Sequence, residues 1–160
     1  MVTTVTSYTE VRNRALIADG YDGVVRVVVG NMYGTGVLLF DGKAVLTAAH
    51  LFNGSSGSAN VIFESRSGVQ TIASSQVVIN PDYNSVNNNS DMALVWLSQD
   101  APVASERFGI YRNSNEVGQI FTMVGYGVPG SGSSGILSNY KEAHTRLKAN
   151  NQFDSDVAPL

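Results

Sequence analysis

Short runs of apolar residues, separated by turn-forming residues, dominate this chain. β-Branched and other apolar residues fill 24–29, 36–40 and 43–48, and Asp41-Gly42 joins the last two runs as a strong hairpin signal. Further runs of the same kind lie at 60–64, 70–73, 76–79, 92–97 and 119–125. Short strands that alternate with turns in this way predict an antiparallel barrel or a sandwich.

Four other segments depart from this strand pattern. Apolar residues recur at helical spacing within 8–19, which predicts a short helix, and residues 136–148 also have a helical composition. Residues 82–90 are rich in asparagine, and residues 130–135 consist of glycine and serine alone. Both of these segments are therefore predicted to be loops.

One of the predicted strands ends on a histidine, and another begins after an aspartate. Val45-Leu46-Thr47-Ala48-Ala49-His50 is largely apolar before its last residue, and Asp91 precedes the run at 92–97. Histidine takes up and returns a proton near neutral pH, and a carboxylate on Nδ1 would leave Nε2 free to act as a base. An imidazole that becomes positive would in turn stabilise a carboxylate at the head of an apolar strand. The structural alternatives are a core histidine and an aspartate that only caps a loop.

Five short motifs follow one another along the chain in an informative order. The second is moderately specific by itself, and the fourth and fifth, in this order, make it strong. The five motifs are Gly34-Thr35-Gly36-Val37-Leu38, Thr47-Ala48-Ala49-His50, Asn80-Pro81-Asp82-Tyr83-Asn84, Asp91-Met92-Ala93-Leu94 and Val124-Gly125-Tyr126-Gly127. In this order they resemble the trypsin/chymotrypsin family of serine endopeptidases, from about residue 24 to residue 127. The resemblance implies that His50 is the general base of a Ser-His-Asp triad and that Asp91 orients it.

The resemblance also implies the fold and its division. We expect a mainly β protein that contains the first of two antiparallel trypsin-like barrels and the start of the second. Residues 1–23 would form an N-terminal segment that includes the short helix, and residues 24–124 the first barrel, which carries His50 and Asp91. Residues 125–160 would be a linker and the incomplete start of the second barrel.

The nucleophile is missing from this set of motifs. In the family, Gly-Asp-Ser-Gly-Gly supplies the serine and the oxyanion hole, and the chain contains no such string. Ser131, Ser133 and Ser134 lie in a segment that lacks the aspartate and follows Gly127 too closely, so we interpret it as a loop. We expect the serine to lie beyond residue 160 or on another chain, and this chain alone to be inactive.

Cofactor chemistry has little support in the sequence. The spacing Gly130-x-Gly132-x-x-Gly135 matches a dinucleotide fingerprint, but nothing upstream alternates strands with helices as such a domain requires. His50 and His144 are the two histidines and there is no cysteine, so a zinc site is not expected. The loop at 82–90 has one carboxylate, Asp82, which favours turns over a calcium site. We expect neither a cofactor nor a metal.

Composition restricts the partners. Charged residues make up 14% of the chain, the net charge is −3, and lysine and arginine do not cluster, so nucleic acid is not an expected partner. No apolar run approaches the roughly 20 residues of a membrane span. Leu51 and Gly34 stand where many animal members of the family have bridged cysteines, which favours a bacterial-type member. The polar, Ser- and Asn-rich composition favours secretion, although residues 1–7 lack the features of a signal peptide.

Two hypotheses of different classes follow. The first is a serine endopeptidase that acts on a polypeptide and needs the missing C-terminal half, or a second chain, to complete its active site. The second is a non-catalytic, protease-like module that binds a protein partner, which the missing serine motif favours.

Overall fold

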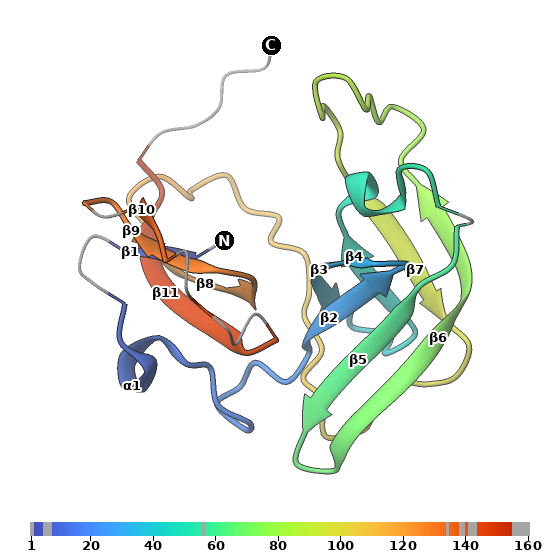
Figure 1. Cartoon of the computed structure of the whole chain (residues 1–160), viewed down its shortest axis with the longest axis horizontal. Helices are drawn as coiled ribbons and strands as arrows, with labels where there is room; N and C mark the ends of the chain where they lie inside the picture. Colours follow the sequence, from blue (N-terminus) through green and yellow to red (C-terminus); the bar gives the residue numbers. More distant parts are fainter. Residues whose placement is uncertain are drawn as a thin grey trace. The chain divides into compact units, whose positions relative to one another are not determined.

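The chain forms two compact units (Figure 1). The computed structural model describes residues 2–4, 8–55, 57–133, 135–137, 140 and 144–154 of the 160-residue chain. One unit consists of Leu16–Gly109, and the other combines Met1–Ala15 with Ile110–Leu160. We call them the barrel unit and the terminal unit.

Six strands close into an antiparallel barrel in the barrel unit. In order around the barrel they are β2 (Val24–Val29), β3 (Met32–Leu38), β4 (Ala44–Thr47), β7 (Ala93–Leu97), β6 (Gly68–Ile79) and β5 (Asn60–Ser65), which pairs with β2 again. Closure removes the unpaired edges that an open sheet would expose. A short 3-10 helix, η1 (Ala49–Phe52), follows β4. The predicted mainly β, trypsin-like barrel is confirmed.

Alternate residues of the strands fill the interior of the barrel. Val25 and Val27 on β2 are fully buried. They pack in one cluster with residues from all five remaining strands of the barrel, including Leu38, Val45, Val61, Phe63, Ile72 and Val95. Gly36 on β3 makes room for this packing, because a Cβ there would lie 2.5 Å from Cγ1 of Val45 and 2.7 Å from Cγ2 of Val27.

The predicted hairpin at Asp41-Gly42 joins β3 to β4. Gly42 adopts a φ of +70°, which a residue with a side chain rarely adopts, and its N–H donates to the carbonyl of Leu39 at 3.0 Å. The Asp41 carboxylate accepts the N–H groups of Lys43 and Ala44 at 3.0 and 3.2 Å. Side chain and backbone together close the turn, as expected for these residue types.

Two predicted boundaries in the barrel differ from the structure. β3 begins at Met32, four residues before the run predicted at 36–40. β6 is a single strand of 12 residues, whereas the sequence predicted two, at 70–73 and 76–79. The polar residues between them form a bulge, where the register with β7 shifts between Ser74 and Gln76 and the Ser75 hydroxyl donates to the carbonyl of Leu97 at 3.1 Å.

The terminal unit contains the remaining elements. β8 (Ile120–Tyr126) pairs antiparallel with β11 (Arg146–Gln152), and β9 (Pro129–Ser131) lies between β1 (Val2–Thr4) and β10 (Gly135–Ile136). The predicted N-terminal helix is confined to the four residues of α1 (Glu10–Asn13).

Several predicted features lie in the terminal unit. β8 belongs here, although the first barrel was predicted to extend over 24–124. The segment 130–135 takes part in β9 and β10 rather than forming only a loop. Within 136–148, residues 146–148 are strand, and residues 138, 139 and 141–143 lie outside the described part of the chain.

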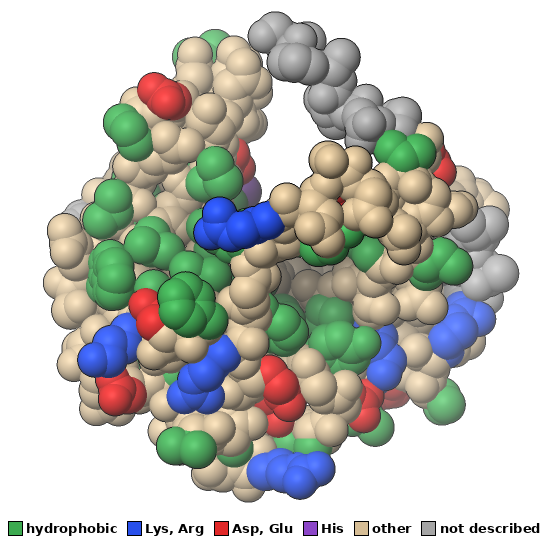
Figure 2. All heavy atoms as spheres, turned by 180° about the vertical axis from the view of Figure 1, so that it is seen from behind, with side chains coloured by type: hydrophobic (Ala, Val, Ile, Leu, Met, Phe, Trp, Pro, Cys, Tyr) green, Lys and Arg blue, Asp and Glu red, His purple; other side chains and the backbone are tan. Residues whose placement is uncertain are grey.

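The surface carries few charges. On the face in Figure 2, basic and acidic side chains are scattered among uncharged surface, in line with a charged content of 14%. Among the described residues, no helix has the length and the apolar composition that crossing a bilayer would require.

Candidate active site

The pairing of β4 with β7 brings the two predicted site residues together. Thr47, the last residue of β4, is the register partner of Ala93, the first residue of β7. Because the strands are antiparallel, the chain leaves β4 at the end of the barrel where it enters β7. His50 follows Thr47 by three residues, and Asp91 precedes Ala93 by two. Side chains 41 positions apart in the sequence therefore meet at one end of the barrel.

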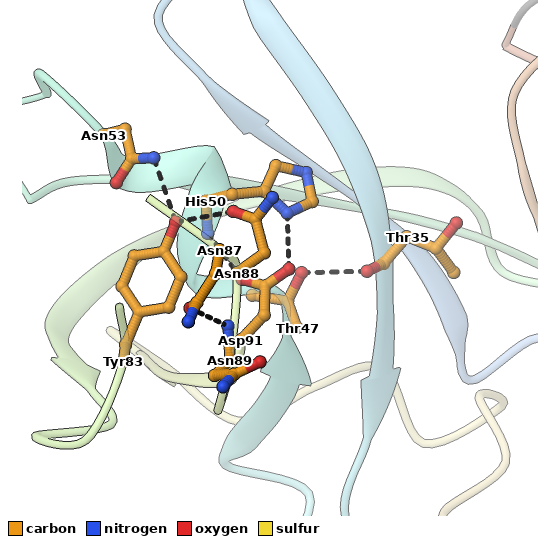
Figure 3. Close-up of polar contacts among 9 residues, drawn as sticks. All are labelled: Thr35, Thr47, His50, Asn53, Tyr83, Asn87, Asn88, Asn89 and Asp91. Atoms are coloured by element: carbon orange, nitrogen blue, oxygen red, sulfur yellow. Dashed lines mark hydrogen bonds and ion pairs between the residues drawn. The ribbon is translucent and has the colours of Figure 1, made fainter. Parts of the chain in front are cut away.

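His50 and Asp91 make two hydrogen bonds (Figure 3). Nδ1 of the imidazole lies 2.7 Å from Oδ2 of Asp91, and the backbone N–H of His50 donates to Oδ1 at 2.8 Å. A carboxylate on Nδ1 holds the ring proton there and leaves Nε2 as the basic nitrogen. The pair has the contact that a general base and its orienting carboxylate require.

The pKa of Asp91 lies below its ordinary value of 3.8. Partial burial by itself would raise this pKa, but the hydrogen bonds from the side chain and backbone of His50 lower it and prevail, helped by the attraction of the imidazole. Asp91 is therefore ionised at neutral pH, and it can stabilise positive charge on the ring.

The imidazole of His50 is more accessible than the carboxylate that binds it. The His50 side chain is 51% exposed, whereas that of Asp91 is 25% exposed. Among the residues that the structure describes, none donates to or accepts from Nε2 in a hydrogen bond. Nδ1 is thus occupied by Asp91, and no described residue competes for Nε2.

Thr47 secures the end of β4 just before the histidine. Its hydroxyl is buried and donates to the carbonyl of Thr35 on β3 at 2.8 Å. β3 and β4 pair through Val37 with Leu46 and through Leu38 with Val45. The bond from Thr47 to Thr35 therefore links the two strands beyond these paired residues. It restrains the backbone from which η1 and His50 emerge.

The Asn-rich loop before Asp91 is built from turns closed by side chains. The N–H groups of Asp82, Val86 and Asn89 donate to the side-chain oxygens of the residue two positions before each, at 2.9 to 3.1 Å. Two residues, Asn88 and Ser90, adopt positive φ angles of 57° and 55°. Asparagine fits such turns because its short amide bonds locally and tolerates this conformation. In the described parts of the chain, no group of three or more acidic or histidine side chains is arranged to hold a metal.

Sequence reasoning missed a second contact beside the pair. Tyr83 accepts a hydrogen bond from Nδ2 of Asn53 at 3.0 Å and donates to Oδ1 of Asn88 at 3.3 Å (Figure 3). The available sequence signal was an aromatic residue in an otherwise polar loop. That signal could not reveal the partner Asn53, which lies 30 positions away.

The serines of the Gly/Ser segment lie in the terminal unit. Ser131 is buried in β9, and its hydroxyl lies 3.3 Å from that of Ser133. Ser134 lies outside the described residues. His144, the second histidine, is exposed.

Comparison with known proteins supports the family that the motifs suggested. The family model described as Trypsin matches residues 18–158. This range covers most of the chain and includes both His50 and Asp91. A search of curated proteins finds none that matches it. On the extent of the family match, and with the barrel and the histidine–aspartate pair in place, this chain belongs to the trypsin family of serine proteases.

Proposed function

We propose that the protein is a serine endopeptidase in which this chain supplies the general base, His50, and its orienting carboxylate, Asp91. The observation that carries the proposal is the pair of hydrogen bonds between them, at 2.7 and 2.8 Å, with the His50 side chain 51% exposed. Proteins of this family hydrolyse peptide bonds, so the substrate class is a polypeptide. The nucleophilic serine is supplied by residues beyond 160 or by another chain, since the family motif that carries it is absent from this sequence.

The chemistry follows from the two nitrogens of His50. Nε2 accepts the proton of the serine hydroxyl as its oxygen attacks the scissile carbonyl, and the Nδ1 proton stays on the bond to Asp91. The imidazolium that forms is stabilised by the ionised carboxylate. It then gives the proton to the leaving amine as the peptide bond breaks and the acyl-enzyme forms. In the second half of the reaction, water gives a proton to Nε2 and attacks the acyl-enzyme. The bond to the serine breaks, the serine oxygen takes the proton back, and the carboxylic acid product is released. The oxyanion hole accompanies the serine.

Secretion and a bacterial-type origin also belong to the proposal. The low charge and the abundance of serine and asparagine favour a secreted protein, and the lack of cysteine favours a bacterial-type member of the family. An immunoblot of medium and cells from the native source checks the location, and retention of the protein in the cells would contradict secretion.

Activity-based labelling tests the proposed enzyme. The natural gene product, together with any segment or chain that carries Gly-Asp-Ser-Gly, is treated with a serine-directed fluorophosphonate and assayed on peptides. We expect labelling and cleavage in the wild type, and a loss of kcat of about 10⁶-fold in His50→Ala and about 10⁴-fold in Asp91→Asn. His144→Ala, which removes the other histidine, serves as the matched control and should retain activity.

The outcomes separate the two candidate functions. If His50→Ala cleaves peptides as fast as the wild type, the assignment of the base is wrong. If the folded natural product neither reacts nor cleaves and no serine-bearing chain accompanies it, the protease-like binding module is the better account. The absence of the serine motif from this sequence is the observation that favours that alternative.

A further inference from the structure

The two segments that carry the catalytic pair are joined at a second point. His50 lies in η1, and Asn53 is the residue that ends this helix. Asp91 follows Asn88 by three residues, as Asn53 follows His50 by three. Tyr83 connects Asn53 to Asn88 through its hydroxyl. The histidine turn and the aspartate loop are thus held by His50–Asp91 at one point and by Tyr83 at another, three residues away along each segment.

These contacts form a closed circuit. The backbone connects His50 to Asn53, and two hydrogen bonds through Tyr83 connect Asn53 to Asn88. The backbone then connects Asn88 to Asp91, whose carboxylate binds His50. The strand pairing of Thr47 with Ala93 and the two bonds of Asp91 to His50 already join the segments on the side of the barrel. The contact through Tyr83 restrains the parts that lie beyond them, and so further restricts the angle at which the carboxylate meets the imidazole.

The two hydrogen bonds through Tyr83 run in the same direction. The amide of Asn53 donates to the phenol, and the phenol donates to the amide oxygen of Asn88. Each group that donates to its neighbour becomes a better acceptor, so successive bonds strengthen one another. The hydroxyl of Tyr83 is the central member, and its removal breaks both bonds at once.

Tyr83 is itself anchored. It is half-buried and packs against the hydrophobic core of the barrel, while its backbone N–H donates to the carbonyl of Asn80 at 3.0 Å. Asn88 and Ser90, in contrast, are exposed and hold left-handed backbone conformations. Such conformations are disfavoured for residues with side chains and persist where surrounding contacts hold them. The anchored phenol is one contact that holds the exposed part of the loop.

We propose that Tyr83 is a positioning residue of the active site, whose hydroxyl fixes the loop of Asp91 against the turn of His50 and so keeps the carboxylate on Nδ1. It touches neither residue of the pair through a hydrogen bond and acts through Asn53 and Asn88. Its contribution to catalysis rests on the proposed endopeptidase function, whereas its effect on the geometry of the pair does not.

Tyr83→Phe is the test variant, because it deletes the hydroxyl and leaves the ring in the core. Tyr111→Phe is the matched control, since Tyr111 lies in the terminal unit and also donates its hydroxyl to an asparagine, Asn115, at 2.5 Å. The 160-residue chain is studied by NMR. Two quantities are measured: the exchange rate of the His50 Nδ1 proton with water and the pKa of the Asp91 carboxyl from its ¹³C shift.

In Tyr83→Phe we expect the His50 Nδ1 proton to exchange about 5- to 10-fold faster, the factor that corresponds to the loss of one net hydrogen bond. The pKa of Asp91 should rise toward 3.8 as its bonds from His50 loosen. In the complete protease, kcat should fall about 10-fold while KM stays unchanged, as expected for a residue that only positions the pair. Tyr111→Phe should leave all of these values as in the wild type.

A second variant keeps the proposal testable if Tyr83→Phe unfolds. Asn88→Gly removes the acceptor of the phenol, and glycine accepts the φ of 57° at this position. It should change the exchange rate in the same direction, and Tyr83→Phe with Asn88→Gly together should do little more than either alone. A thermal unfolding scan of each variant separates a loss of global stability from a local change at the pair.

The results distinguish this inference from the proposed function. If wild-type protease is active and both variants match Tyr111→Phe in exchange, Asp91 pKa and kcat, Tyr83 has no positioning role and the inference is overturned. If the variants change the NMR quantities but the wild-type protein shows no protease activity, the positioning of the pair stands and the endopeptidase proposal fails.

Discussion

Both oxygens of the Asp91 carboxylate bind the same residue, one through the ring of His50 and the other through its backbone. The backbone bond fixes the carboxylate relative to the chain of the histidine, and the ring bond then fixes the imidazole relative to the carboxylate. An amide at position 91 could serve only one of these contacts with an oxygen. Ionisation and orientation of the pair therefore depend on each other.

The lowered pKa of Asp91 predicts a dependence of stability on pH. A carboxyl whose pKa is lower in the folded than in the unfolded state stabilises the fold above the unfolded value of 3.8, and this contribution disappears as the pH falls through the folded pKa. We expect Asp91→Asn to lower the free energy of unfolding by about 1 kcal/mol at pH 7. This difference from the wild type should shrink below pH 3.8.

Urea unfolding of both proteins from pH 7 down to pH 3 measures the difference. Asp41→Asn is a suitable control, because this carboxylate lies in the barrel unit but in a different turn. A difference between Asp91→Asn and the wild type that stays constant over the whole pH range would contradict the role given to ionisation.

At the scale of the elements, close packing around Gly36 lets β3 and β4 pair next to the end of the barrel that carries His50 and Asp91. The side chains of Val27 and Val45 occupy the space on its interior side. A similar relation holds at Gly34, where a Cβ would lie 2.7 Å from Cδ1 of Leu51. Leu51 directly follows the histidine, so these two positions, which hold bridged cysteines in many animal members of the family, pack against each other here.

Gly36→Ala is predicted to destabilise the barrel. The added methyl group would lie 2.5 Å from Cγ1 of Val45, inside a cluster with little room to shift. Overpacking of this kind lowers the free energy of unfolding by about 1–3 kcal/mol. Gly109→Ala is the control, because nothing lies within 4 Å of a Cβ added at that position, and its effect should stay within about 0.5 kcal/mol. Equal denaturation midpoints for the two variants would refute the packing argument.

At the scale of the whole molecule, the two units differ in the amount of core that the structure describes. The barrel unit has a contiguous cluster of buried residues from all six strands. In the terminal unit, the described cluster comprises Leu147 and Ala149 with Tyr8 and Tyr140 packed against them. β8 and β11 form a two-stranded sheet, whereas the barrel strands are paired on both sides. Unfolding of the terminal unit should therefore require less free energy.

Hydrogen exchange should reveal this difference in local stability. Backbone amides paired in β2 to β7 should exchange at least about 10-fold more slowly than those paired between β8 and β11, since fewer apolar contacts oppose local opening of the smaller sheet. Exchange followed by NMR or mass spectrometry on the intact chain checks this expectation. Equal protection of the two sheets would show that they unfold together.

Much of the fold was predictable from local chemistry. The apolar run at 24–29 coincides with β2, and Asp41-Gly42 marks the hairpin between β3 and β4. The break predicted in β6 was wrong, because serine can occupy a bulge as well as a turn, and only the pairing with β7 shows which it does. The predicted domain boundaries remain a prediction, although the structure assigns β8 to the terminal unit.

For the site, residue types and their order along the chain were enough to select His50 and Asp91 as candidates. Each lies beside an apolar strand and within a motif that resembles the family, and the two residue types are a base and a carboxylate. Pairing and distance required the folded chain. The register of Thr47 with Ala93 places the pair at one end of the barrel, and the link through Tyr83 joins residues 30 positions apart. Local sequence encodes strand, turn and acid–base character, whereas contacts between distant segments depend on how the strands close into a barrel.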